Sequence, residues 1–126
     1  MKIQSNLLTL AVLLASILTV SAADTVKVFI LAGQSNMEGK ADQKLIDHQA
    51  TDAKTKGLFK HLRTGDSWTV RDDVFIKFLK RHGGLTTGFG SPGKTGPELE
   101  FGYMMGEHFG EPVLLINAAW LSLIHI

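Results

Sequence analysis

One serine stands where proteins built from alternating strands and helices often place their chemistry. Ser35 follows an apolar run through Gly33 and Gln34, in the segment VFILAGQSNMEGK. A serine at the carboxyl end of a strand, at a turn that opens a helix, lies where open α/β sheets bind ligands. Its hydroxyl can attack a carbonyl carbon, and its own backbone N–H can hold the oxyanion that then forms. Alternatively, the side chain only caps the helix, and local chemistry leaves both roles open.

Two common motifs with a glycine-rich turn between a strand and a helix do not fit this segment. A phosphate-binding loop has four residues between its first glycine and a Gly-Lys pair, followed by Ser or Thr. Here five residues separate Gly33 from Gly39, and Ala41 has no hydroxyl. The nucleophile elbow of α/β-hydrolases has glycine two residues after its serine, where this chain has Met37. Both motifs are therefore excluded.

Composition limits the class of protein that carries this serine. The chain has 126 residues, of which 44% are hydrophobic and 20% charged, as expected for one small globular domain or part of a larger one. The formal net charge is +1 and no basic run occurs, so we predict no nucleic-acid partner. Cysteine is absent. His48, His61 and His82 have no acidic residue at ligand spacing, so we predict no metal site.

The N-terminus has the features of a secretory signal. Lys2 precedes the apolar run LLTLAVLLASILTV over residues 7–20, and the small residues of SAAD follow. The alternative is a membrane anchor, but the run is shorter than the roughly 20 residues that cross a bilayer. We therefore predict a signal peptide at residues 1–22, cleaved after Ala22 or one residue later. The mature protein is expected to be secreted or periplasmic, without stable membrane insertion.

The elements that must position Ser35 follow from hydrophobic periodicity and from turn residues. In chain order we predict a strand at 25–32, a polar helix or loop at 40–56, β-type residues at 68–79, a long glycine-rich loop at 82–96, a helix starting at Pro97 and stopped by Gly110 and Pro112, and a strand at 113–119. A strand, a crossover, a helix and a second strand predict a layered α/β fold with a parallel sheet. We expect the strand at 113–119 to lack a neighbour on one side.

Five segments in one order resemble a known enzyme family. AGQSNMEG resembles the first signature block of the SGNH hydrolases in their GQSN-type branch, the sialate O-acetylesterases and family 6 carbohydrate esterases. WTVRDDVFIKF, GGLTTGFG, GPELEFGYMMGEHF and EPVLLINAAW resemble later segments of those proteins. The resemblance runs from about Val26 to Trp120. It implies a three-layer α/β/α SGNH-hydrolase fold, which is flavodoxin-like with a parallel sheet, and residues 23–126 would be its N-terminal part.

The resemblance also implies roles for four residues. Ser35 matches the nucleophile, and its N–H would be one oxyanion donor. Gly96 matches a second donor, although it is equally suited to be a turn glycine before Pro97. Gln34 and Glu98 match positions that shape the pocket, or they hydrogen-bond to groups around it. The implied substrate is an acetylated carbohydrate of the sialic acid or xylan type, and the reaction needs no cofactor.

The sequence departs from the family where the catalytic base belongs. Those esterases carry a later block with a polar oxyanion residue and a final Asp-x-x-His block. Here no Asp or Glu stands three residues before any His, and Ser122 holds that position before His125. The ending LSLIHI replaces a glycine-rich continuation. We therefore expect an incomplete and inactive N-terminal portion of a secreted carbohydrate O-acetylesterase. The alternative is a non-catalytic carbohydrate-binding or cell-surface protein on the same scaffold.

Overall fold

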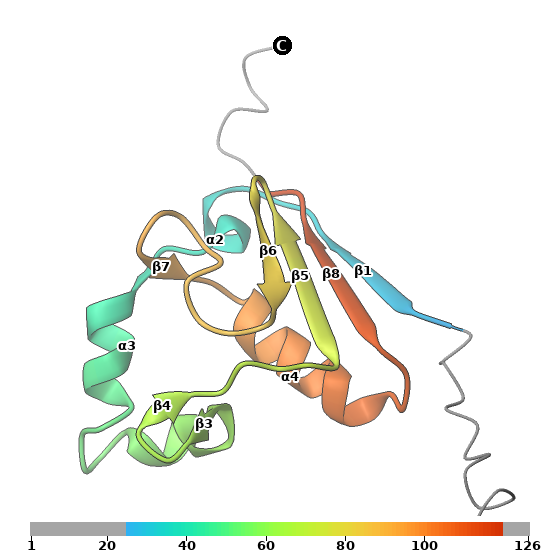
Figure 1. Cartoon of the computed structure of the whole chain (residues 1–126). Coiled ribbons are helices and arrows are strands. Elements are labelled where there is room, and N and C mark those ends of the chain that lie inside the picture. The colour runs from blue at the N-terminus through green and yellow to red at the C-terminus, as the bar shows by residue number, and fades with distance from the viewer. Residues whose placement is uncertain (1–24, 120–126) are drawn as a thin grey trace, which may run out of the picture.

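The structure, a computed structural model, describes residues 25–119 (Figure 1). The predicted signal peptide and His125 lie outside the described residues. The elements in chain order are β1 (Lys27–Leu31), α2 (Ser35–Glu38), β2 (Ala41–Asp42), α3 (Gln43–Gln49), the 3-10 helix η1 (Lys56–Leu62), β3 (Arg63–Thr64), β4 (Ser67–Trp68), β5 (Val74–Phe78), β6 (Arg81–Gly84), β7 (Lys94–Thr95), α4 (Glu98–His108) and β8 (Val113–Asn117).

Four strands form the main sheet, in the order β1-β8-β5-β6. β8 pairs in parallel with β1 on one side and with β5 on the other. The predicted α/β class and the two apolar strands are confirmed. The expectation that the strand at 113–119 lacks a neighbour was wrong, because the chain inserts β8 between β1 and β5. Two further pairs, β2 with β7 and β3 with β4, are antiparallel.

The sheet is mixed rather than purely parallel, because β6 runs antiparallel to β5. The sequence predicted a loop from residue 82, and the structure instead forms β6 there and β7 further on. The error comes from glycine, which has a low strand propensity and so hides a strand in the sequence pattern. At Gly84 the strand needs glycine, since an added Cβ would lie 2.1 Å from the carbonyl oxygen of Arg71.

The hydrophobic core lies between α4 and one face of the sheet. Val74, Ile76, Val113 and Leu115 are buried there by strand alternation. Gly102 of α4 lets the helix approach closely, since an added Cβ would be 2.3 Å from a methyl carbon of Leu85 and 2.7 Å from one of Leu115. This packing holds the strands whose carboxyl ends carry the candidate site.

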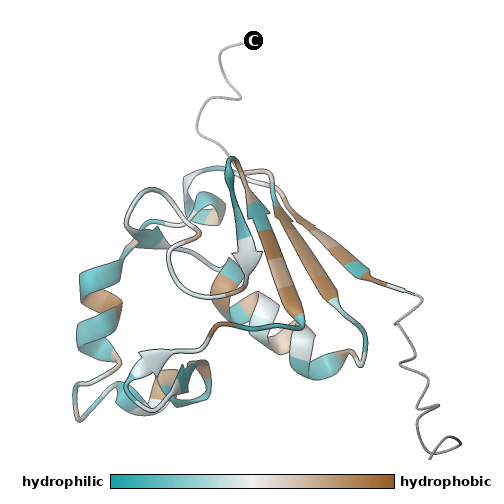
Figure 2. Cartoon of the chain, viewed as in Figure 1, coloured by the Kyte–Doolittle hydropathy of each residue, from teal (hydrophilic) through white to brown (hydrophobic). Residues whose placement is uncertain are grey.

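The opposite face of the sheet is apolar and open among the described residues. Ile30 is 68% exposed and Phe75 is 45% exposed, and both alternate with side chains that face α4. Figure 2 shows the hydrophobic colouring along β1, β8 and β5. The second helical layer of the expected three-layer fold is therefore not seen within residues 25–119. In this part of the chain, no helix has the length and apolar character needed to cross a membrane.

Candidate functional site

Ser35 is the first residue of α2, which lies at the edge where the parallel strands end (Figure 1). The residue is half-buried. Gln34, not Ser35, occupies the N-cap position of α2, and no side chain caps this helix. The structure therefore gives the Ser35 hydroxyl no capping role, which was the alternative to a chemical one.

The turn that carries Ser35 is held by backbone hydrogen bonds and by glycine. The N–H of Glu38 donates to the carbonyl oxygen of Gln34 at 2.8 Å, and that of Gly39 donates to Ser35 O at 3.1 Å. A Cβ on Gly33 would lie 2.7 Å from that of Met37, so the entry to α2 needs glycine. These contacts fix the backbone at Ser35.

Gly39 brings the Ser35 turn into direct contact with the segment before α4. A Cβ on Gly39 would lie 2.6 Å from both Cα and N of Gly96, and Gly39 has φ +92°. The N–H of Ser91 also donates to Gly39 O at 3.1 Å. The turn that begins at Ser35 therefore packs through Gly39 against Gly96, which lies two residues before Glu98.

The N–H of Gly96 is already hydrogen-bonded. It donates to Glu98 Oε1 at 2.9 Å, and a Cβ on Gly96 would lie 2.5 Å from Glu98 Oε2. To act as the predicted oxyanion donor, Gly96 would first have to be released by Glu98. In this arrangement Gly96 serves as the turn glycine that precedes Pro97, while its role as a donor stays a prediction.

Glu98 is a fully buried carboxyl group at the start of α4. Its exposed fraction is 0%, and its Oε2 has no hydrogen-bond partner among the described residues. Burial raises the pKa of Glu98 above its ordinary value, although the N–H groups of Gly96 and Glu98 and the charge of Arg81 oppose this. Glu98 is thus buried and hydrogen-bonded to Gly96 in this structure, while its role in shaping the pocket stays a prediction.

We expect Glu98→Gln to flatten the dependence of stability on pH. Because the folded state raises the pKa of Glu98, it binds this proton more tightly than the unfolded chain does. The protonated carboxyl therefore stabilises the folded state fully below about pH 4.5, which is the ordinary pKa of glutamate. This stabilisation is lost as pH rises through the raised pKa of the folded state. Glutamine is neutral throughout this range and keeps an acceptor for the Gly96 N–H.

The measurement is the urea midpoint of wild type and Glu98→Gln between pH 4 and pH 8. Wild type should lose stability relative to the variant as pH rises. Asp72→Asn removes an exposed carboxyl and serves as the control. Identical pH profiles for wild type and Glu98→Gln would show that Glu98 ionises in the folded state as it does in water.

A polar cluster that sequence reasoning missed joins α2 to the glycine-rich segment. Ser91 Oγ donates to Glu38 Oε1 at 2.6 Å, and Lys40 Nζ donates to Glu38 Oε2 at 2.9 Å and to Ser91 Oγ at 2.5 Å. These hydrogen bonds, first from Ser91 and then from Lys40, hold the pKa of Glu38 below its ordinary value. The only sequence signal was that Glu38 lies three residues after Ser35, one helical turn away.

A cavity of about 420 Å³ opens beside this cluster. Its lining consists of Glu38, Phe78, Leu79, Lys80, Arg81 and Pro92. Because Ser35 and Glu38 lie three residues apart in α2, their side chains share one face of the helix. Leu79 reaches the cavity from the β5–β6 turn with φ +54°, a conformation that leucine rarely adopts. The cavity combines apolar surface with two cationic side chains and with Glu38, which belongs to the same helix as the candidate nucleophile.

Histidine does not contact Ser35 in the described part of the chain. Within residues 25–119, the only histidine side chain that hydrogen-bonds is His61, whose Nε2 lies 2.9 Å from Glu100 Oε2. No group of three or more His, Cys, Asp or Glu side chains in these residues could hold a metal ion. In the described residues, Ser35 therefore has no histidine hydrogen-bonded to it as a base.

A family model described as carbohydrate esterase, sialic acid-specific acetylesterase, matches residues 25–120. The match includes Gln34, Ser35, Gly96 and Glu98, together with all the strands and helices given above. Comparison with curated proteins gave no match, and comparison with solved structures gave none either.

Proposed function

Since this chain belongs to the sialic acid-specific acetylesterase family of carbohydrate esterases, we propose that it removes O-acetyl groups from carbohydrates with Ser35 as nucleophile. The observation that carries this proposal is the position of Ser35. It begins α2 at the carboxyl edge of the parallel strands, its hydroxyl has no capping role, and the family match spans it. The cavity of about 420 Å³ that Glu38 of the same helix lines is of a size that takes a sugar ring.

In the proposed reaction, Ser35 Oγ attacks the carbonyl carbon of the acetyl ester and a base takes its proton. The N–H of Ser35 stabilises the negative oxygen of the tetrahedral intermediate. The C–O bond to the sugar then breaks, the sugar oxygen receives the proton, and an acetyl group remains on Ser35. Water attacks this acyl-enzyme and releases acetate, with the base again accepting and returning a proton.

We propose that the base lies outside residues 25–119, because no described histidine hydrogen-bonds to Ser35. A serine hydroxyl is a weak nucleophile without a base in reach. Residues 25–119 alone are therefore expected to release no acetate above background. The open apolar face of the sheet supports the same view, since α/β sheets with parallel strands are normally covered by helices on both faces.

Acetate release from an acetylated sialic acid and from an acetylated xylan tests this function and its substrate. The enzyme used should be the chain extended through its genomic reading frame, so that a base can be present. A second candidate, a non-catalytic carbohydrate-binding or cell-surface protein, is favoured by one observation, the engagement of the Gly96 N–H by Glu98. Such a protein would bind these glycans and release no acetate.

We also propose that the protein is exported, with residues 1–22 removed as a signal peptide. The apolar run at 7–20 is short and is followed by small residues, which supports cleavage rather than anchoring. N-terminal sequencing of the secreted protein should therefore begin at Ala23 or Asp24. Secreted material that begins at Met1 would contradict this prediction.

A further inference from the structure

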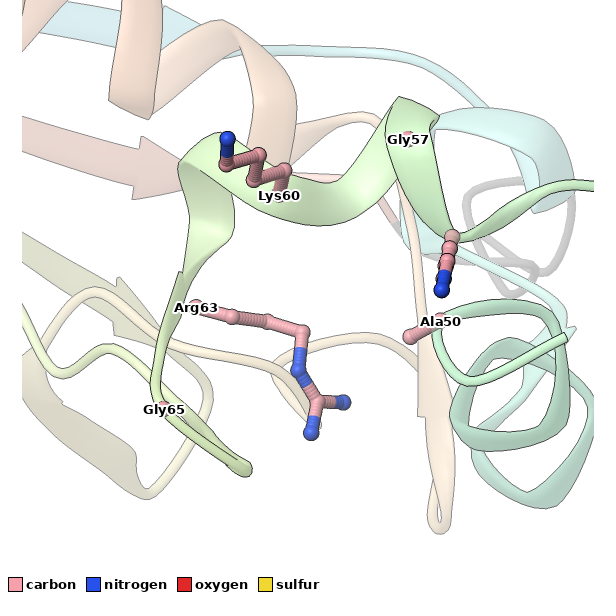
Figure 3. A pocket seen from close by; sticks show the side chains of 6 residues that line it. Ala50, Gly57, Lys60, Arg63 and Gly65 are labelled. Atoms are coloured by element: carbon pink, nitrogen blue, oxygen red, sulfur yellow. The ribbon is translucent and has the colours of Figure 1, made fainter. Parts of the chain in front are cut away.

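A second cavity, at the opposite end of α3 from α2, is lined by cationic side chains and, among the described residues, by no acidic one. It has a volume of about 540 Å³ and lies between the end of α3, η1 and the β3–β4 hairpin (Figure 3). Its lining consists of Ala50, Lys56, Gly57, Lys60, Arg63 and Gly65. None of the predicted site residues contributes to it, so it is separate from the candidate esterase site.

Arg63 is the central side chain of this cavity, and neighbouring groups hold it in place. Its Nη2 donates to the carbonyl oxygen of Asp66, and its guanidinium lies 5.3 Å from the ring centre of Trp68. Trp68 is fixed in turn, since its Nε1 donates to Asp47 Oδ1 at 2.7 Å. Figure 3 shows Arg63 extending across the hollow toward Ala50. Nε and Nη1 of Arg63 have no hydrogen-bond partner among the described residues.

The cations of this cavity have no carboxylate partner among the described residues, as is also true of five of the nine other lysines and arginines in residues 25–119. Four basic residues elsewhere form ion pairs: Lys27 with Glu111, Lys40 with Glu38, Arg71 with Asp73 and Glu107, and Lys94 with Asp42. Within residues 25–119, no acidic side chain forms an ion pair with Lys56, Lys60 or Arg63. The amino group of Lys60 points away from the guanidinium in Figure 3. The lysines therefore add positive potential, while Arg63 offers the direct contact.

We propose that this cavity binds the carboxylate of an acidic sugar through Arg63. The planar guanidinium matches a carboxylate with two parallel N–H donors, and a pre-oriented arginine loses less side-chain freedom on binding. The cavity is large enough for one sugar ring. Gly57, Gly65 and Ala50 leave room along the walls because they have little or no side chain.

Such a site would hold an acidic glycan away from the ester that Ser35 attacks. The choice of a sugar as the ligand rests on the proposed function, whereas the anion site itself rests on the geometry around Arg63. The anion site can therefore be correct even if the proposed esterase function is wrong, and the reverse also holds. Ser35→Ala should abolish esterase activity and leave binding at this cavity unchanged.

The fluorescence of Trp68 gives a direct test, since Arg63 stacks on its ring. The chain has two tryptophans, and Trp120→Phe leaves Trp68 as the single reporter. N-acetylneuraminic acid, its carboxyl methyl ester and inorganic phosphate would each be titrated. We expect the acid to bind about tenfold or more tightly than the ester, because the ester cannot accept the charge-assisted hydrogen bonds of Arg63. Binding should weaken with salt.

Arg63→Gln is expected to weaken binding of the acid by about tenfold or more. Arg63→Lys keeps the positive charge but lacks the two parallel N–H donors of the guanidinium, so it should lose most of this affinity. Lys60→Gln should weaken binding by a smaller factor, which keeps the test available if Arg63 variants fold poorly. Lys44→Gln, which changes an exposed lysine outside the cavity, is the matched control and should have no effect on binding.

Equal binding of the acid and the ester, or equal binding of the acid by wild type and by Arg63→Gln, would show that this cavity is not a carboxylate site. Phosphate binding as tight as that of the acid would overturn its assignment to a sugar.

Discussion

Ser35→Ala is expected to reduce acetate release by a factor of about 10³ or more, measured in the chain extended through its genomic reading frame. The substitution removes the one oxygen that attacks the acetyl carbon, and no neighbouring hydroxyl replaces it at the start of α2. The residual rate would come from water attack assisted by the remaining N–H donors. The assay is acetate release from an acetylated glycan at saturating substrate.

The same variant should fold as wild type does, because the Ser35 hydroxyl makes no capping hydrogen bond that alanine would lose. Circular dichroism and the urea midpoint check this. Ser67→Ala, an exposed serine on β4, is the matched control and should retain full activity. Unchanged turnover in Ser35→Ala would mean that Ser35 is not the nucleophile.

Gly96→Ala is expected to lower stability by about 1–3 kcal/mol or more, and to lower activity further than the stability loss explains. The new Cβ would lie 2.5 Å from Glu98 Oε2 and 2.5 Å from the Cα of Gly39. One of these contacts is backbone and cannot move without shifting the turn, whose Gly39 N–H donates to Ser35 O. A buried carboxyl and a backbone segment must therefore both move.

Thermal unfolding measures this effect, since 1 kcal/mol corresponds to a shift in Tm of about 4–8 °C in a domain of this size. Gly110→Ala is the control, because an added Cβ there meets no atom within 4 Å. Amide exchange at residues 35–39 would show whether the turn loosens. A Tm for Gly96→Ala equal to that of Gly110→Ala would contradict the close packing of Gly96 on Gly39.

The elements with strong local signals could be predicted from the sequence. The runs at 25–32 and 113–119 are apolar and rich in β-type residues, and they form β1 and β8. The helix α4 follows Pro97 and ends before Gly110, as the proline and glycine signals indicate. In each of these elements, periodicity and boundary residues favoured the same structure.

What depends on distant contacts could not be predicted. The sequence pattern does not show that β8 lies between β1 and β5, because this order arises from pairing between segments far apart in the chain. The hydrogen bonds that Glu38 makes with Ser91 and that Gly96 makes with Glu98 also need the folded chain. Glu98 was predicted to shape the pocket or to hydrogen-bond to groups around it, and its complete burial could not be read from the sequence.

The acyl-enzyme on Ser35 is the most direct test of the proposed function. The extended protein should be mixed with an acetylated sialic acid, quenched with acid during turnover, digested and examined by mass spectrometry. The account predicts one acetyl group on Ser35 in the peptide that contains GQSNMEG, and none in Ser35→Ala. Acetate release with no acetyl group on Ser35, or with the group on another residue, would contradict it.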